Sequence, residues 1–402
     1  MTEQLKISAS EATPGDKSEF PGMFTEDGTP WHYLDSAATA QKPQIVLDSV
    51  AWALGEGYAT VHRGVYSRSA KMTMGYEAAR RRVAAFIGGG EDELVFTRGA
   101  TEAINLVAYS YPKKGRVLLS QLEHHSNIVP WQLAGWQVDV CPLTEDGRID
   151  LGALEALLTP RTRLVALGHV SNVLGSVLDA RAAADLAHSV GAKLLLDGCQ
   201  AAPRMKLDMA ALDCDFYAFS GHKIYGPTGI GVLWARENIL DAMPPYQGGG
   251  SMIDRVTFEK TTYAPPPQRF EAGTPMITEA IALHAAIDYL DGYGVDRAYD
   301  HERKLARTLR EALTALNSVR LFGPEDSAGI VSFAMEGVHP HDLGTILDEE
   351  HVAIRAGHHC AQPLMDHLGV PATARASFGL YSDESDIAAL LRGIERTQRI
   401  FG

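Results

Sequence analysis

Short apolar runs alternate with amphipathic stretches along the first 245 residues of the chain. The runs are almost continuously apolar, which is typical of strands covered on both faces. The stretches between the earlier runs, such as "TEAINLVAYSY" and "DARAAADLAHSV", have helical periodicity. This alternation predicts an α/β fold with a large, mainly parallel sheet between layers of helices. The strands are expected at residues 93–99, 116–120, 138–143, 163–170, 193–198, 215–221 and 229–235.

The alternation stops at residues 246–276, where Gly and Pro crowd both ends of a charged stretch. A segment of this length indicates a functional loop or an interface segment. Two helical patterns and a smaller α+β unit follow, and residues 1–30 are expected to form a loose N-terminal arm. We therefore divide the chain into the arm, a large domain at 31–276 and a C-terminal part at 277–402. The later elements are expected at 278–293, 296–317, 329–335, 351–356 and 373–380, with a last helix from Asp383.

Charge and composition narrow the class of protein. The 402 residues include 36 basic and 50 acidic ones, for a formal net charge of −14, which argues against sequence-independent binding of nucleic acid. No apolar run is long enough to span a membrane, and the polar opening does not resemble a signal peptide. The four cysteines form no C-x-x-C pair, so free thiols in the cytoplasm are expected.

A lysine and an aspartate follow two of the predicted strands. Lys223 comes directly after one strand, and poor solvation there favours the neutral amine that forms Schiff bases. Asp197 ends another strand, at the edge of a parallel sheet where ligands bind. Such a carboxylate can keep the ring nitrogen of pyridoxal 5′-phosphate (PLP) protonated. The alternatives are a lysine that reaches back to water and an aspartate that caps the next helix.

A phosphate site is expected at the junction "FTRGATEAINLV". The backbone N–H groups of Ala100 and Thr101, with the Thr101 hydroxyl, lie at the start of a predicted helix. Ser220 and His222 beside Lys223 offer further donors. Many strand–helix junctions look similar, so this pattern alone does not identify a phosphate site.

Two histidine pairs offer further chemistry. His124 and His125 follow a strand, where an imidazole can stack on a cofactor and exchange protons. A zinc site is the alternative, although no ligand spacing such as H-E-x-x-H accompanies the pair. In "RAGHHCAQP", Cys360 follows the second pair, and the local string leaves open a metal ligand, a disulfide, a buried filler and a nucleophile.

Several motifs in order resemble the PLP-dependent cysteine desulfurases of the SufS type (group II). This group belongs to the class-V aminotransferase family and is close to the selenocysteine lyases. The resemblance covers about residues 30–402 and implies a fold-type-I PLP enzyme. It departs at Ala100, where a hydroxyl residue is common, and at Cys199, where alanine is expected. The motifs that carry it are "YLDSAATAQKP", "VHRGVYSRSA", "EHHSNIVPWQ", "HVSNVLG", "DGCQAA", "DFYAFSGHKIYGPTGIG", "GGGSMI", "RFEAGTP" and "RAGHHCAQP".

The resemblance implies a role for each matching residue. Lys223 would hold PLP as a Schiff base, Asp197 would pair with the ring nitrogen, and Gln200 would bond to the ring hydroxyl. His124 would stack on the ring, and Cys360 would be the nucleophile that accepts sulfur. The phosphate would be held by Ala100, Thr101, Ser220 and His222, and by Gly273 and Thr274 of a second subunit. The substrate would be bound by Asn172, Arg375, Arg355, Ala37, His62 and Arg63.

The implied reaction converts L-cysteine to L-alanine and leaves a persulfide on Cys360 for iron–sulfur cluster assembly. The implied partners are a second copy of the chain, which makes a homodimer with shared sites, and a small SufE- or SufU-like acceptor. Three alternatives stay open: a selenocysteine lyase, a PLP aminotransferase or lyase that uses no cysteine, and a metal-binding or scaffold protein.

Overall fold

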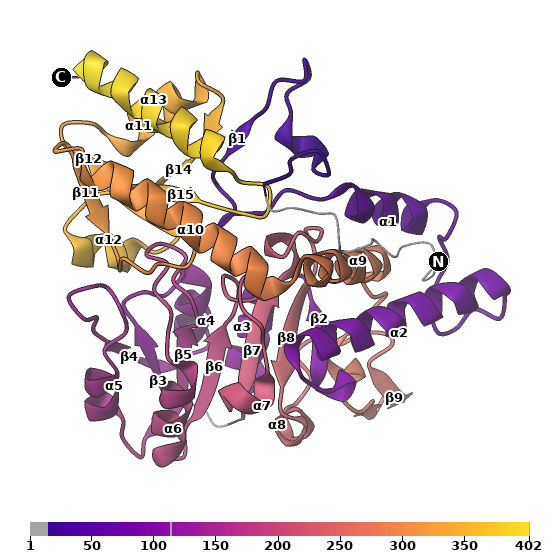
Figure 1. Ribbon diagram of the computed structural model, residues 1–402. Helices are drawn as coiled ribbons and strands as arrows, with labels where there is room; N and C mark the ends of the chain where they lie inside the picture. The colour runs from indigo at the N-terminus through magenta and orange to yellow at the C-terminus, as the bar shows by residue number, and fades with distance from the viewer. Residues whose placement is uncertain (1–14, 113–114, 402) are drawn as a thin grey trace.

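A seven-stranded sheet forms the centre of the computed structural model, which describes residues 15–112 and 115–401 (Figure 1). Five neighbouring strands are parallel, whereas β8 is antiparallel to both of its neighbours. The predicted α/β fold with a mainly parallel sheet is therefore confirmed. In spatial order the strands are β2 (Leu94–Thr97), β8 (Gly231–Ala235), β7 (Phe216–Ser220), β6 (Lys193–Asp197), β5 (Thr162–Gly168), β3 (Arg116–Ser120) and β4 (Gln137–Cys141).

The continuous apolar runs exist because both faces of this sheet are covered. In β6, Leu194 and Leu196 belong to one hydrophobic core and Leu195 belongs to the other, and all three are fully buried. One face is covered by α3 (Ala100–Ser110), α4 (Val129–Leu133) and α8 (Glu237–Ala242). The opposite face is covered by α5 (Leu151–Leu157), α6 (Ala180–Ser189), α7 (Met209–Leu212), α2 (Ser67–Ile87) and α9 (Ile277–Tyr293).

The helix α9 is apolar on most of its surface and lies inside the protein. It packs against α2 and against α1 (Gln44–Leu54), and its residues join the core of the large sheet. The next helix, α10 (Val295–Thr314), contributes Leu305 and Leu309 to the core of the C-terminal unit. The division expected at residue 277 stays a prediction.

A smaller antiparallel sheet lies beyond the carboxyl edge of the large one (Figure 1). Its core is separate from the two cores of the large sheet. Its strands, in spatial order, are β11 (Val319–Phe322), β12 (Ile330–Met335), β15 (Thr373–Ser377) and β14 (Arg355–Gly357). The helices that follow α10 in this unit are α11 (Pro340–Asp348), α12 (Gln362–Leu368) and α13 (Glu384–Phe401).

The first described residues of the expected N-terminal arm pack against the rest of the protein, whereas residues 26–30 are exposed. Phe20 is fully buried, and β1 (His32–Tyr33) pairs in parallel with β13 (Val352–Ala353) of the C-terminal unit. Lys17 and His32 both contact the buried carboxylate of Asp386 on α13, at 2.8 and 2.7 Å. Residues 1–14 of the expected arm lie outside the described residues.

The segment at 246–276 contains an antiparallel hairpin, β9 (Ile253–Val256) and β10 (Thr261–Tyr263). Most of the hairpin is exposed, so it lacks the apolar run that marks the strands of the central sheet. No helix among the described residues is long and apolar enough to cross a membrane.

Candidate active site

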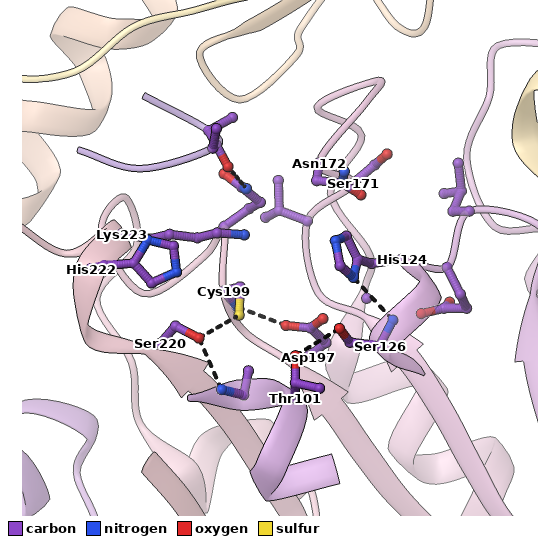
Figure 2. Close-up of a pocket in the computed structure, with 18 of the residues that line it drawn as sticks. Thr101, His124, Ser126, Ser171, Asn172, Asp197, Cys199, Ser220, His222 and Lys223 are labelled. Carbon is purple, nitrogen blue, oxygen red and sulfur yellow. Dashed lines mark hydrogen bonds between the residues drawn. The ribbon is translucent and has the colours of Figure 1, made fainter. Parts of the chain in front are cut away.

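The segments that follow five strands of the central sheet meet at one edge. Strands β3, β5, β6 and β7 are parallel, and β2 runs in the same direction because β8 reverses between β2 and β7. Their carboxyl ends surround a cavity, as expected for a sheet of this kind (Figure 2). Twelve predicted site residues line this cavity: Ala37, Ala100, Thr101, His124, Asn172, Asp197, Gln200, Ser220, His222, Lys223, Arg355 and Arg375.

Asp197 and Lys223 reach the same cavity from neighbouring strands (Figure 2). Asp197 is the last residue of β6, and its Oδ1 accepts a hydrogen bond from the backbone N–H of Cys199 at 3.0 Å. Lys223 ends the 3₁₀ turn η4 (Gly221–Lys223), which follows β7 directly. The sheet therefore places a carboxylate and a primary amine on the wall of one cavity.

The imidazole of His124 is neutral and has a defined tautomer. Burial, and secondly the charge of Lys223, lower the pKa of His124 to about 4. Its Nδ1 accepts a hydrogen bond from the backbone N–H of Ser126 at 3.1 Å. The remaining proton is therefore on Nε2 at neutral pH.

Hydroxyl and N–H groups gather where α3 begins. Ser220 Oγ accepts the backbone N–H of Ala100 at 2.9 Å, so this predicted phosphate donor is engaged by a side chain. Thr101 Oγ1 and Ser126 Oγ lie 2.8 Å apart. Burial, and secondly Lys223, lower the pKa of His222 to about 4. Together these groups form a polar part of the cavity wall.

Two arginines lie on adjacent strands of the small sheet. Arg355 on β14 is in register with Arg375 on β15, and both line the cavity. Arg375 is fully buried; its Nη1 donates to Asn172 O and its Nη2 contacts Asp35 Oδ1, each at 2.8 Å. Its Nε has no hydrogen-bond partner among the described residues. This guanidinium can therefore still bind the carboxylate of a substrate.

Cys360 lies beside the cavity and in contact with one of its arginines. Arg355 Nη2 is 3.7 Å from Cys360 Sγ. Burial lowers the pKa of His359 to about 2, and its Nε2 contacts Thr373 instead of the thiol. Cys360 itself is half-buried and has a left-handed backbone, with φ of 56°.

Hydrogen bonds from backbone and side-chain groups of the large domain hold the Cys360 loop in place. The backbone N–H of His125 donates to Cys360 O at 2.7 Å, and His125 Nε2 accepts the N–H of Gln362 at 3.0 Å. Asn172 Nδ2 donates to His359 O at 2.8 Å. The loop is thus fixed by the same segments that carry the cavity residues.

Four other predicted site residues lie outside the cavity wall of this single chain. The ring of His62 contacts Glu77 at 2.7 Å, and Arg63 follows it on the surface. Gly273 and Thr274 lie in the segment after the hairpin, and Thr274 is exposed. Their predicted contacts stay predictions.

A family model for the class-V aminotransferases matches residues 32–390. The chain belongs to the class-V aminotransferase family. Within the family, it is 46% identical to the "Cysteine desulfurase" of Cronobacter sakazakii, over 96% of this chain and 98% of the relative. The predicted resemblance is confirmed by this match.

Two solved structures have the same fold as this chain. The cysteine desulfurase CsdA of Escherichia coli, in an S-sulfonic acid form, matches with a TM-score of 0.90 and 40% identity, over 96% of this chain and 98% of that one. A C-DES mutant with glycine linked covalently to its PLP cofactor matches with a TM-score of 0.82 over 96% and 100% of the two chains. At 23% identity, the second likeness shows the fold alone.

The class-V site contains two residues that the sequence patterns did not single out, Glu123 and Asp35, and it gives His125 a contact that the sequence did not predict. Glu123 lines the cavity, and burial raises its pKa to about 7 although Ser120 and Asn127 donate to it. Asp35 and His125 hold Arg375 and the Cys360 loop. The motifs "YLDSAA" and "EHHSN" contain these residues, but only the fold shows what each of them contacts.

The donors and acceptors of this class-V site fit PLP. Asp197 offers an acceptor for a protonated ring nitrogen, Lys223 an amine, and His124 a flat neutral ring. The hydroxyl groups of Thr101, Ser126 and Ser220 gather at the start of α3 and offer donors for a phosphate. The described residues contain no group of three His, Cys, Asp or Glu side chains arranged for a metal.

Proposed function

We propose that this protein is a PLP-dependent cysteine desulfurase, which converts L-cysteine to L-alanine and supplies sulfur for iron–sulfur clusters. One observation carries the proposal. Arg355 lines the cavity of Lys223 and Asp197, and its Nη2 also lies 3.7 Å from Cys360 Sγ. A thiol so placed beside a PLP site distinguishes this reaction from the aminotransferase alternative.

Each side chain in the cavity has a task that follows from its chemistry. Arg375 and Asn172 orient the carboxylate of cysteine. When bound, PLP supplies an electron sink for the electrons of the broken Cα–H bond. Lys223 Nζ takes the Cα proton, and Asp197 keeps a proton on the ring nitrogen by accepting its hydrogen bond.

Sulfur transfer then involves Cys360 alone among the cysteines. Its thiolate attacks the sulfur atom of the substrate, an S–S bond forms and the Cβ–S bond of the substrate breaks. The electron pair of the broken bond stays on Cβ, which takes up a proton, and the proton held on Lys223 Nζ returns to Cα to give alanine. Arg355 Nη2 lies 3.7 Å from Sγ, so a positive charge faces the sulfur atom that attacks.

The experiment measures alanine released from L-cysteine by the purified holoenzyme. Cys360→Ala is expected to abolish release and to keep the visible absorbance of bound PLP, whereas Lys223→Ala is expected to lose both. Cys141→Ala, which changes a buried thiol at the end of β4, is the matched control. Undiminished alanine release by Cys360→Ala would refute the role of this thiol.

Selenocysteine tests the alternative on the same site. A selenol is more acidic than a thiol and leaves more easily, so its release does not require Cys360 as strictly. Retained turnover of selenocysteine by Cys360→Ala, with cysteine turnover lost, is the expected pattern for a desulfurase. A wild-type protein that acts only on selenocysteine would identify a lyase instead.

Two partners belong to this proposal. The first is a second copy of the chain, whose Gly273 and Thr274 complete the phosphate site; exposed apolar side chains on the hairpin, such as Phe258 at 109% exposure, support such an interface. Activity regained by mixing Lys223→Ala with a Thr274 variant would demonstrate shared sites.

The second partner is a small SufE- or SufU-like acceptor, which is expected to accelerate alanine release. A cytoplasmic location fits the four free thiols.

A further inference from the structure

The amide of Gln200 has one defined orientation at the cavity wall. Gln200 lies in the turn after β6 and is 2% exposed. Its Oε1 accepts a hydrogen bond from Arg204 Nη1 at 2.9 Å, and its Nε2 donates to Ala37 O at 2.7 Å. A guanidinium can only donate, so Oε1 must face Arg204 and the amide hydrogens must face the cavity side, where Ala37 lies.

Arg204 is itself held from three directions. Its Nε lies 2.7 Å from Glu302 Oε2 on α10, which is orange in Figure 1. Nη1 also donates to Gln200 O at 3.0 Å, and Nη2 donates to Phe378 O, just after β15, at 3.4 Å. Both partners of the ion pair are buried, at 2% and 1% exposure. Since neither charge reaches water, the guanidinium is confined to one place.

The backbone leaves room for this ion pair. Gly329 has a φ of 69°, and a Cβ built there would lie 2.8 Å from Glu302 Oε2 and 3.4 Å from Arg204 Nε. Glycine is therefore the residue that lets the carboxylate and the guanidinium meet at this point. The ion pair joins the turn after β6 to the C-terminal unit.

We propose that Arg204 is a positioning residue, which holds the Gln200 amide with Nε2 toward the cavity, so that the N–H not bonded to Ala37 O donates to an oxygen anion on the ring of bound PLP. The inference rests on the proposed function, since it requires that cofactor. Arg204 touches neither substrate nor cofactor and acts through Gln200. A donor held in place stabilises the anion at no cost in reorganisation.

The test uses the paired variant Arg204→Met/Glu302→Gln, which removes both charges and leaves neither buried alone. The visible absorbance of the holoprotein is titrated with pH, and PLP is titrated into the apoprotein. Without a fixed donor the anion is less stable, so the midpoint of the absorbance titration is expected to move upward. Half-saturation is expected to need roughly two- to tenfold more PLP, because losing one buried hydrogen bond weakens binding by about that factor.

The same variants in a Gln200→Ala background separate positioning from general damage. There the paired change is expected to cause no further shift of the midpoint. Asp215→Asn is the matched control, because it alters a buried carboxylate that contacts Lys193, at the opposite end of β6 from Asp197. It is expected to lower Tm and to leave the midpoint in place.

Two results would overturn the inference while the proposed function stands. One is an absorbance titration of Arg204→Met/Glu302→Gln with the same midpoint as the wild type. The other is a midpoint shift by the paired change that is equally large in the Gln200→Ala background. Gly329→Ala, which displaces the ion pair without deleting a charge, must shift the midpoint in the same direction. A wild-type protein that gains no visible absorbance with PLP would instead refute the proposed function.

Discussion

Arg375 is a fully buried cation with one nitrogen, Nε, that has no hydrogen-bond partner among the described residues. Asp35 and Asn172 O bind two of its nitrogens and leave Nε free, and Arg355 lies in register beside it. Burial, rather than any one neighbour, is the main reason that the pKa of Arg375 is lowered. An incoming carboxylate would supply the missing partner and offset the repulsion between the two arginines.

Arg375→Lys should raise the KM for cysteine at least about tenfold, because a single ammonium cannot replace a planar fork of donors. The visible absorbance of bound PLP should stay unchanged, since Arg375 lies on the substrate side. Steady-state kinetics and an absorbance spectrum measure both. Arg320→Lys on β11, which exchanges an exposed arginine of the same sheet, should leave KM as it is. An unchanged KM in Arg375→Lys would contradict carboxylate binding.

The four cysteines differ in their chemistry because they differ in burial. Burial raises the pKa of Cys199 and Cys214 to about 12 and that of Cys141 to about 11, whereas Cys360 is half-buried beside Arg355. Cys199 is therefore an inert thiol in the cavity wall, although it stands where the family resemblance led us to expect alanine.

A brief reaction with iodoacetamide near neutral pH should label Cys360 alone, because only a thiolate that solvent reaches is alkylated quickly. Mass spectrometry of the native protein counts the labels. Cys360→Ser should take up no label in the native state. The unfolded wild-type protein should take up four labels. Early labelling of Cys199 would contradict its burial.

The loop between β14 and α12 combines a strained backbone with fixed ends. His359 and Cys360 both have positive φ, at 53° and 56°, which costs free energy that neighbouring contacts must offset. His125 supplies two of those contacts, through its backbone N–H and through Nε2.

His125→Ala should lose the side-chain contact to Gln362 and let the loop move. We expect alanine release to fall several-fold, with unchanged absorbance of bound PLP and faster hydrogen exchange at residues 358–362. His358→Ala, which removes an exposed histidine of the same loop, is the control. Equal hydrogen exchange in both variants would contradict the bracing role of His125.

The sequence predicts elements well where periodicity is strong. All seven strands of the central sheet lie where apolar runs were found, because burial on both faces requires such runs. The hairpin of β9 and β10 was missed because it is mostly exposed, and periodicity does not report that β8 is reversed. In the site, Lys223 and Asp197 were predictable as strand-end residues. The contacts of Asp35 with Arg375 and of Arg204 with Glu302 join distant parts of the chain, so only the fold reveals them.

Several histidines are buried in the neutral form, and this links the stability of the protein to pH. Burial lowers the pKa of His169 from 6.5 to about 4, and it also lowers that of His124, His222 and His359. The unfolded chain binds these protons below about pH 6.5 and the native protein does not. Each such histidine therefore contributes a loss of stability as the pH falls from about 6.5 toward 4.

His169→Asn should reduce this acid sensitivity, because asparagine can still bond to Tyr217 OH but does not titrate. Between about pH 7 and pH 5, the variant should lose about 2 kcal/mol less unfolding free energy than the wild type. Denaturant melts at the two pH values measure the difference. His341→Asn, on the exposed surface of α11, should behave as the wild type does. An equal loss in all three proteins would contradict the prediction.

The pairing of β1 with β13 limits how this protein can be taken apart. Residues 15–33 pack on the C-terminal unit through Asp386 and β13. The strands of the large sheet come later in the chain. The C-terminal unit is therefore not expected to fold by itself or as a part of another protein. A fragment that starts at α10 would lack a strand and two partners of a buried carboxylate, so gene fusions and truncations must keep both ends of the chain together.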